Sequence, residues 1–469
     1  MNYDLIVIGG GPAGYVAAIR AAQLGKKVAC VEKERAGGTC LNWGCIPTKS
    51  LLRNAELFHI FAHRSAEFGF KADNISFDWT KIIARSRDVS DKNAGGIEFL
   101  FKKNKVDYIR GEGSMEKAGS VTVKSADGKL ETHTASKIML ATGCISRPMP
   151  GFAFHGKTVI SSKEAMILPE QPKSMIVIGA GAIGVEFAYF YNTMGTKVTV
   201  VEFMDRIVPV EDADISKELE KQLKKKGITV LTSSEVTKVD TSGSGVKATV
   251  KSAAGESVLE AEIMLSAVGI APNIENIGIE ENGIKVEKGR IVVDKGQQTS
   301  VAGIYAIGDC SPGQALAHVA GKEGINAAES IGYLEKKCNH KPDAIDYNNI
   351  PGCTYCSPEI ASVGFTEKAA KDAGYEVKVG KFPFMASGKA SASGNTDGFV
   401  KVIFDAKYGE FLGAHMIGAG VTEMIAEVVV ARKLETTHHE ILNAIHPHPT
   451  MSEAVKEAVA AAYGEAIDI

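Results

Sequence analysis

A glycine-rich turn between an apolar strand and a helix occurs twice in this 469-residue chain. The first copy, "DLIVIGGGPAG", leads into the helix pattern "YVAAIRAAQLG" and a second apolar run, "KVACVE". Buried parallel strands read as continuous apolar runs, and a helix carries apolar residues with a 3.6-residue period. The pattern therefore predicts a strand–turn–helix–strand unit, the context in which such glycines bind a dinucleotide.

Each copy has three glycines and a closing glutamate. The glycines permit a tight turn and bring a pyrophosphate close to the helix N-terminus, and the glutamate accepts hydrogen bonds from ribose hydroxyls. The copies are offset by 170 residues, from position 9 to position 179. The residues are Gly9, Gly11, Gly14 and Glu32 in the first copy, and Gly179, Gly181, Gly184 and Glu202 in the second.

A second repeated pattern supports a duplication of the strand–turn–helix–strand unit. "KIMLATG" at 137–143 and "EIMLSAVG" at 262–269 are both buried-strand patterns that end in a glycine turn. Two dinucleotide sites in one chain predict electron transfer between FAD and a nicotinamide dinucleotide. Glu202 would repel a 2′-phosphate and favours NAD over NADP, although the nearby Arg206 weakens that preference slightly.

Charge and hydropathy exclude several classes of partner. The formal net charge of −3 gives no basic stripe for nucleic acid or anionic lipid. No apolar run approaches the roughly 20 residues that span a bilayer. The N-terminus shows no secretory signal pattern. We therefore expect a cytoplasmic protein, and a mature organellar protein without its transit peptide would look similar.

The stretch "GGTCLNWGCIPTKS" at 37–50 contains Cys40 and Cys45. The spacing lacks the second half of a zinc site, so we expect no metal. A structural disulfide would be unusual in a reducing compartment, which favours a redox-active pair. Gly44 would give the backbone freedom that lets the pair close, and Pro47 fits the first turn of a helix. A helix N-terminus also predicts a lowered thiol pKa.

The other six cysteines have ordinary interpretations. Cys353 and Cys356 form a C-x2-C pattern among strand-like residues and are expected to be buried or half-buried strand cysteines. The isolated ones are expected to be small core residues; these are Cys30, Cys144, Cys310 and Cys338.

Near the C-terminus, "AIHPHPTMSEAVKEAV" holds His446 and His448 between prolines. A helix should start near Thr450, and Thr450 with Glu453 fits a capping box. The alternative is a histidine base for a thiol, oriented by the Glu453 carboxylate. The residues alone leave both interpretations open.

Taken together, the cysteine stretch, the two glycine turns, "LATG", "GIYAIGDC" and "HPHPTMSEA" resemble the pyridine nucleotide-disulphide oxidoreductases. The likeness covers the whole chain. It implies an α/β fold with two Rossmann-like dinucleotide-binding domains and a C-terminal α+β dimerisation domain. The implied layout is an FAD-binding domain at 1–145, an NAD-binding domain at 146–275, a central segment at 276–346 that completes the FAD site, and the dimerisation domain at 347–469.

The resemblance also implies residue roles. Cys40 would meet the substrate and Cys45 would face the flavin. His448, held by Glu453, would be the base and would act across a homodimer interface, with His446 only a neighbour. Lys49 would pair with Glu186 beside the flavin. The remaining FAD-side residues would be Thr39, Gly113, Thr142, Gly143, Asp309 and Ala317, and Gly269 would contact NAD.

Within the family, the motifs are most similar to the branch that oxidises dihydrolipoamide with NAD. The expected partners are lipoyl-bearing proteins. They would be the lipoyl-bearing proteins and E2 core of 2-oxo acid dehydrogenase complexes, or the glycine cleavage H protein. A reductase for another thiol substrate is the alternative, and a non-enzymatic flavoprotein component of a complex is a third. One departure is Ile270 in "GIAPN", where the family usually has arginine.

Overall fold

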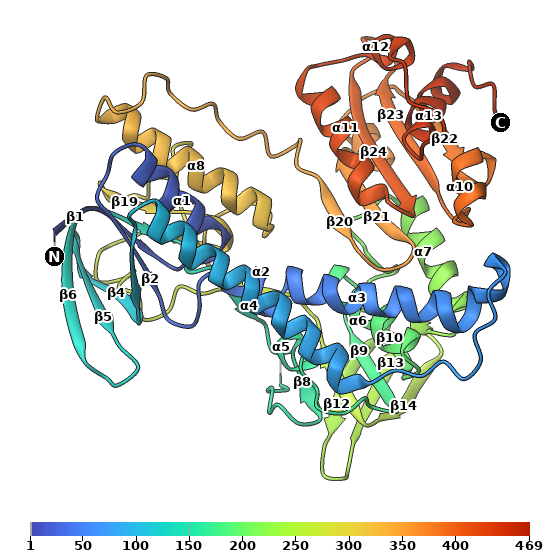
Figure 1. Ribbon diagram of the computed structural model, residues 1–469, viewed down its shortest axis with the longest axis horizontal. Helices are drawn as coiled ribbons and strands as arrows, with labels where there is room; N and C mark the ends of the chain where they lie inside the picture. Colours follow the sequence, from blue (N-terminus) through green and yellow to red (C-terminus); the bar gives the residue numbers. More distant parts are fainter. Residues whose placement is uncertain (1, 150) are drawn as a thin grey trace. The chain divides into compact units, whose positions relative to one another are not determined.

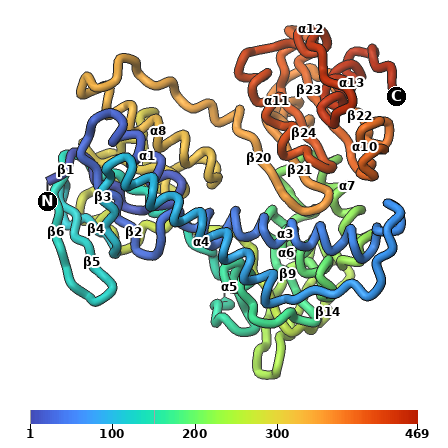
Figure 2. The backbone as a smooth tube through the Cα atoms, viewed as in Figure 1, coloured from blue at the N-terminus to red at the C-terminus, as the bar shows by residue number. Residues whose placement is uncertain are grey.

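The computed structural model describes residues 2–149 and 151–469 (Figure 1). They form two compact units, each of which is treated by itself. The first contains the residues up to Ser50, Thr80–Arg147 and Gly269–Tyr347, and the second contains Leu51–Trp79, Pro148–Val268 and Asn348–Ile469. The chain passes from one unit to the other at 50/51, 79/80, 147/148, 268/269 and 347/348. Residues 335–351 contain no helix or strand, and Figure 2 traces the backbone of the described chain.

The sheet of the first unit is built around the first glycine turn. Its strand order is β3-β2-β1-β6-β5-β4, and β19 also pairs with β6. β1, β2, β3, β6 and β19 pair in parallel, whereas β4 and β5 join antiparallel. The strands are β1 (Asn2–Ile8), β2 (Val28–Glu32), β3 (Asp107–Arg110), β4 (Glu112–Lys117), β5 (Ser120–Lys124), β6 (Leu130–Leu140) and β19 (Ile304–Ala306).

Helices and two small ribbons complete this unit. The helices are α1 (Pro12–Gln23), α2 (Gly38–Trp43), α4 (Trp79–Lys103), α8 (Ala317–Leu334), the start of α3 (Cys45–His59) and the 3-10 turn η3 (Gly308–Cys310). The ribbons pair β7 (Cys144–Ser146) with β16 (Ile270–Pro272), and β17 (Val286–Glu287) with β18 (Arg290–Ile291).

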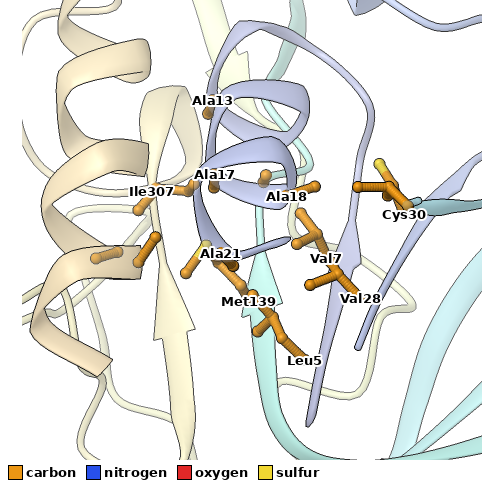
Figure 3. Packing of buried hydrophobic residues seen from close by; sticks show 14 of the residues in the cluster. Leu5, Val7, Ala13, Ala17, Ala18, Ala21, Val28, Cys30, Met139 and Ile307 are labelled. Atoms are coloured by element: carbon orange, nitrogen blue, oxygen red, sulfur yellow. The ribbon is translucent and has the colours of Figure 1, made fainter. Parts of the chain in front are cut away.

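Small residues let α1 lie close to its neighbours. Ala17, Ala18 and Ala21 are fully buried and pack with strand residues such as Val7 and Met139 (Figure 3). A Cβ on Gly324 of α8 would lie only 2.7 Å from the carbonyl oxygen of Ala13. The glycine turn at the end of β1 is therefore carried on a tightly packed strand and helix.

The second unit repeats this sheet. Its strand order is β11-β10-β9-β15-β8, with all neighbours parallel. β9, β10 and β15 take the places that β1, β2 and β6 take in the first unit, as the duplicated patterns predict. The strands are β8 (Val159–Ile160), β9 (Ser174–Ile178), β10 (Lys197–Val201), β11 (Thr229–Leu231) and β15 (Ile263–Ser266).

Further elements accompany this parallel sheet. An antiparallel sheet contains β12 (Glu235–Asp240), β13 (Val246–Ser252) and β14 (Gly255–Ala261). The helical segments are η1 (Ile60–Arg64), η2 (Ser65–Phe68), α5 (Ser162–Ala165), α6 (Ala182–Thr193) and α7 (Ala213–Lys225).

The C-terminal part of the second unit is an antiparallel sheet with helices. Its order is β20-β21-β24-β23-β22, and α11 and α13 pack against it. Its strands are β20 (Gly352–Thr354), β21 (Glu359–Gly364), β22 (Val377–Pro383), β23 (Phe399–Asp405) and β24 (Phe411–Gly418). Its helical segments are α9 (Glu367–Asp372), η4 (Phe384–Ala386), α10 (Gly388–Ser393), α11 (Val421–Lys433), α12 (His438–Asn443) and α13 (Glu453–Tyr463).

The α/β class, with two Rossmann-like sheets and a C-terminal α+β part, is confirmed. The stretch "FVKVIFD" alternates apolar and polar residues, yet it forms β23, in which all seven residues are buried. β23 lies inside the sheet, and its polar Lys401 is buried because it bonds to acidic side chains of α7 and its N-cap.

Candidate active site

The first glycine turn is shaped for an anionic ligand. Gly9 has φ +108°, and a Cβ there would overlap the carbonyl oxygen of Ala141. A Cβ on Gly14 would overlap the carbonyl oxygen of Gly9, so β1 and α1 meet without side chains between them. Gly11 caps α1 with no side-chain hydrogen bond. The first-turn N–H groups of α1 are therefore not used by a capping side chain, as a pyrophosphate site requires.

The second turn has the same geometry. Gly179 has φ +93°, and a Cβ there would lie 2.6 Å from the carbonyl oxygen of Ala267. A Cβ on Gly184 would overlap the carbonyl oxygen of Gly179. Gly181 caps α6, also without a side-chain bond, and faces open space. Both turns fit a dinucleotide.

The two closing glutamates are held in the same way. Glu32 accepts hydrogen bonds from the backbone N–H groups of Gly10 and Glu34, each at 2.8 Å. Glu202 accepts them from Ala180 at 2.6 Å and Met204 at 2.8 Å. These donors are again offset by 170 residues. Each carboxylate is thus fixed at the end of its strand, where it can accept further hydrogen bonds from a ribose.

The residues predicted near FAD mostly lie around the ends of β1, β2 and β6. Gly113 on β4 allows close packing, because a Cβ there would lie 3.0 Å from Val31. Gly143 has φ +69°. Asp309 lies in η3, and its Oδ2 accepts a hydrogen bond from the Cys144 thiol at 2.9 Å. The others lie on helices or beside the strand end; Thr39 is on α2, Lys49 on α3, Ala317 begins α8, and Thr142 follows β6.

Cys40 and Cys45 lie on opposite sides of a break between two helices. Cys40 is in α2, and Cys45 begins α3. Gly44 between them has φ −148° and ψ −114°, and a Cβ there would lie 3.1 Å from the carbonyl oxygen of Thr39. Gly44 therefore allows the approach that a regular helix would forbid.

Two side chains that the sequence argument missed fix this break. Buried Asn42 donates from Nδ2 to the carbonyl oxygens of Ala36 and Gly38, at 3.1 and 2.9 Å. Thr48 donates from Oγ1 to the carbonyl oxygen of Gly44 at 2.7 Å. Asn and Thr bonding to nearby backbone is a recognisable signal, but it does not by itself mark a site.

The two cysteines are free thiols in contact, which changes the expected acidity. A hydrogen bond with Cys45 and then burial raise the pKa of the Cys40 thiol above its ordinary value, while the Lys49 ammonium acts in the opposite sense. The lowering expected at a helix N-terminus concerns the pKa of Cys45, the first residue of α3, and stays a prediction. The contact itself is what a reversible disulfide needs.

At the C-terminal end of the second unit, His448 and Glu453 interact. His448 Nδ1 lies 2.8 Å from Glu453 Oε1, and the imidazole is 78% exposed. Glu453 Oε2 also accepts the backbone N–H of Thr450 at 2.8 Å. Burial opposes it, but the bonds from Thr450 and His448 lower the pKa of the Glu453 carboxyl. One carboxylate thus bonds to both His448 and the Thr450 backbone.

The helix begins later than predicted. α13 starts at Glu453 with Ser452 as its N-cap, and the Thr450 hydroxyl donates to the carbonyl oxygen of Pro447 rather than capping. His446 has a separate partner: its Nε2 lies 2.7 Å from Glu427 Oε1 on α11, and its side chain is only 8% exposed. Of the two histidines, His448 is the accessible one.

On the nicotinamide side, Glu186 is buried on α6. Its Oε1 accepts the backbone N–H of Tyr355 at 2.9 Å. The pairing of Glu186 with Lys49 remains a prediction. Gly269 has φ +116° and precedes β16, in which Ile270 takes the place of the usual arginine.

The remaining cysteines mostly match their expectation. Cys30, Cys310 and Cys338 are buried, and Cys353 is half-buried in β20. Cys356 is buried in the turn before β21 instead of in a strand. Cys144 is the exception, because it is half-buried and bonds to Asp309.

Within residues 2–149 and 151–469, no three His, Cys, Asp or Glu side chains gather as a metal site would require. In the same ranges, none of the helices combines the length and the apolar character that crossing a bilayer demands.

Comparison with known proteins gives a consistent result. The family model of the pyridine nucleotide-disulphide oxidoreductases matches residues 3–324, and the model of their dimerisation domain matches 350–459. Dihydrolipoyl dehydrogenases of Rhizobium etli and Zymomonas mobilis are each 48% identical, covering 100% and 99% of this chain and 99% of their own lengths. That of Mycobacterium leprae is 44% identical over 100% of this chain and 99% of its own.

Solved structures agree. LpdA from Mycobacterium tuberculosis has a TM-score of 0.89 at 27% identity, covering 97% of this chain and 98% of its own. The HOCl-induced flavoprotein disulfide reductase RclA from Escherichia coli has a TM-score of 0.85 at 26% identity, covering 98% of this chain and 99% of its own.

Proposed function

This chain belongs to the pyridine nucleotide-disulphide oxidoreductase family, and on that premise we propose that it acts as a dihydrolipoyl dehydrogenase. It is an oxidoreductase that oxidises dihydrolipoamide to lipoamide and reduces NAD to NADH. The observation that carries the proposal is the contact between the Cys40 and Cys45 thiols at the Gly44 break.

FAD and NAD are the cofactors. The uncapped start of α1, with Glu32 at the end of β2, fits the FAD pyrophosphate and ribose, and we propose that Asp309 binds the ribityl chain. The equivalent start of α6, with Glu202, fits NAD. Bound FAD would supply the two-electron redox chemistry that links the cysteine pair to NAD.

The cysteine pair performs thiol–disulfide exchange in two displacements. A substrate thiolate bonds to Cys40 Sγ and breaks the Cys40–Cys45 bond, which leaves Cys45 as the thiolate. The second substrate thiol then loses its proton, bonds to the first substrate sulfur and releases Cys40. The substrate gives up two electrons as lipoamide, and the protein disulfide takes them up as two thiol groups.

His448 supplies the base for these steps. A carboxylate whose pKa is lowered accepts hydrogen bonds only, so Glu453 holds the proton of His448 on Nδ1. Nε2 is then the nitrogen that takes the substrate proton. The 78% exposure of the imidazole leaves it accessible, and we propose that His448 of the partner subunit serves each cysteine pair.

The match to a dimerisation domain supports a homodimer. We propose that the substrate is the dihydrolipoyl group carried by another protein. The carrier either belongs to a 2-oxo acid dehydrogenase complex with its E2 core or is the glycine cleavage H protein. The cytoplasm is the proposed compartment.

The proposal is tested by steady-state oxidation of dihydrolipoamide with NAD in Cys40→Ser and Cys45→Ser variants. Both should lose nearly all activity while retaining FAD. Cys353→Ser, at a half-buried thiol of the second unit, is the matched control and should stay active. Substantial dihydrolipoamide turnover by either serine variant would contradict the proposal, and an inactive wild type that reduces another disulfide with a nicotinamide coenzyme would move the chain to a different substrate.

A further inference from the structure

Cys144 is the one cysteine outside the redox pair whose thiol contacts a carboxylate predicted to bind a cofactor. Its Sγ donates to Asp309 Oδ2 at 2.9 Å. The two residues come from segments 165 positions apart in sequence. Both lie in the first unit, so the contact belongs to one compact body.

The backbone around Cys144 is held on both sides. β7 pairs with β16, which places Cys144 opposite Pro272. Asn273 donates its backbone N–H to the carbonyl oxygen of Gly143 at 2.9 Å and its Nδ2 to that of Thr142 at 3.3 Å. The thiol is therefore presented by a fixed strand end.

The turn that carries Asp309 is fixed as well. Glu323 is 1% exposed, and its Oε2 accepts the backbone N–H of Gly308 at 2.7 Å. Arg290 Nη1 donates to the carbonyl oxygens of Asp309 and Ser311, at 3.1 and 2.8 Å. With both backbones held, the thiol–carboxylate bond decides where the Asp309 carboxylate points.

The charge environment keeps this thiol a donor. Burial, then the charge of Asp309 and its hydrogen bond, raise the pKa of the Cys144 thiol, whereas Arg290 acts weakly in the opposite sense. A protonated thiol can donate to a carboxylate, but a thiolate beside Asp309 would repel it. The group is thus suited to orientation and not to nucleophilic attack.

We propose that Cys144 is a positioning residue for FAD, whose thiol occupies Oδ2 of Asp309 and aims Oδ1 at a ribityl hydroxyl. The proposal rests on the proposed function, since it takes Asp309 as an FAD ligand. The thiol of Cys144 bonds to Oδ2 of Asp309 and not to Oδ1. The alternative is that the Cys144 side chain contributes packing only and does not orient Asp309.

The test is FAD binding, measured by titrating the flavin-free protein with FAD and following flavin fluorescence. A hydrogen bond to a charged group is worth about tenfold in a dissociation constant, so Cys144→Ala should weaken FAD binding about tenfold. Cys144→Ser retains a hydroxyl donor and should restore binding to near wild type. Cys338→Ala, at a buried thiol of the same unit that contacts His340, should have no effect.

A double-mutant cycle separates positioning from packing. In an Asp309→Ala background, Cys144→Ala should cause no further loss of FAD affinity. A similar loss in both backgrounds, or a Cys144→Ser variant as weak as Cys144→Ala, would overturn the proposal. Equal melting temperatures of the flavin-free variants would show that folding is unaffected. A wild type that binds no FAD would instead overturn the proposed function.

Discussion

Glu453 combines two roles that the sequence presents as alternatives. Its Oε2 takes the Thr450 N–H at the start of α13, and its Oε1 holds His448. One carboxylate can do both because its two oxygens point to different partners. The capping box predicted for Thr450 does not form, because Ser452 is the N-cap of α13, but Glu453 still bonds to the Thr450 backbone while it holds His448.

The His448–Glu453 pair predicts a graded loss of activity. Removing the base with His448→Gln should lower kcat about 100-fold to 10,000-fold, the usual contribution of a general base. Glu453→Gln should lower kcat less than His448→Gln does, because the imidazole remains and only its orientation and the position of its proton are lost. Steady-state kinetics measures both.

Glu427→Gln is the matched control for that experiment, because Glu427 forms the neighbouring pair with the buried His446. It should leave kcat within a few-fold of wild type. A Glu427→Gln loss equal to that of Glu453→Gln would show that the fold of this segment, and not the His448 base, is being measured.

Glu211 is a titrating residue away from the predicted active site. Its Oε2 is buried and has no hydrogen-bond partner among residues 2–149 and 151–469. Burial raises the pKa of this carboxyl to about 7; a hydrogen bond with Ser362 opposes the shift, and the charge of Asp212 adds to it. The folded protein therefore binds this proton more tightly than the unfolded chain.

This shift fixes the sign of a pH dependence. Between the ordinary glutamate pKa of about 4.3 and the folded value, the native state holds more protons, so Glu211 makes the free energy of unfolding fall as pH rises. Glu211→Gln should remove this contribution and be more stable than wild type at pH 8, by on the order of 1–3 kcal/mol, but not at pH 5. Urea unfolding at the two pH values measures it, and a pH-independent difference would contradict the assignment.

At the scale of elements, the sequence predicted best where local pattern and tertiary environment agree. The two glycine turns, their strands and their helices follow from local patterns, and even the backbone donors to Glu32 and Glu202 repeat. The role of Gly44 could be predicted because a glycine between two cysteines close in sequence indicates a backbone that can bend to bring them together. Asp309 and Cys144 could be matched only in space, since 165 residues separate them.

β23 shows why burial is harder to predict. The alternation of apolar and polar residues in "FVKVIFD" indicates a strand with one solvent-exposed face, yet Lys401 is only 3% exposed. Its Nζ lies 2.9 Å from Asp212 and 3.1 Å from Asp214 in the α7 region, and 2.8 Å from Glu367 on α9. Burial opposes it, but bonds to Glu367 and Asp212 raise the pKa of Lys401 above its ordinary value. No local pattern reveals acids that lie 187 or 189 residues away.

This cluster predicts a large effect on stability. Lys401→Ala leaves the buried Asp212 carboxylate without its cation and should lower the free energy of unfolding by about 3–5 kcal/mol. Lys381→Ala removes a 46% exposed lysine 3.6 Å from Asp214 and should cost less than about 1 kcal/mol. Chemical denaturation of the holoenzyme gives both values. Similar small losses would show that Lys401 contributes no more than a surface ion pair.

At the scale of the whole molecule, the account requires two subunits. The cysteine pair is in the first unit and His448 is in the second. The match to a dimerisation domain provides the assembly in which a base from one subunit could serve the other. A subunit that lacks Cys45 and a subunit that lacks His448 should then complement each other.

Co-expressing differently tagged Cys45→Ser and His448→Ala chains tests this. Each variant alone should be nearly inactive, whereas the purified heterodimer carries one intact site and should recover about half of the wild-type rate. If the base acted within its own subunit, both sites of the heterodimer would be damaged. A heterodimer as inactive as its parents would contradict action across the interface.

The central claim is that Cys40 and Cys45 pass electrons from dihydrolipoamide to the flavin. The most direct measurement is the absorption spectrum of the purified holoenzyme reduced anaerobically with dihydrolipoamide, followed by addition of NAD, in wild type and Cys45→Ser. A long-wavelength thiolate-to-flavin band in wild type only, with NADH formed on adding NAD, is the predicted result. A flavin that stays oxidised with dihydrolipoamide, while NADPH and another disulfide react readily, would contradict the account.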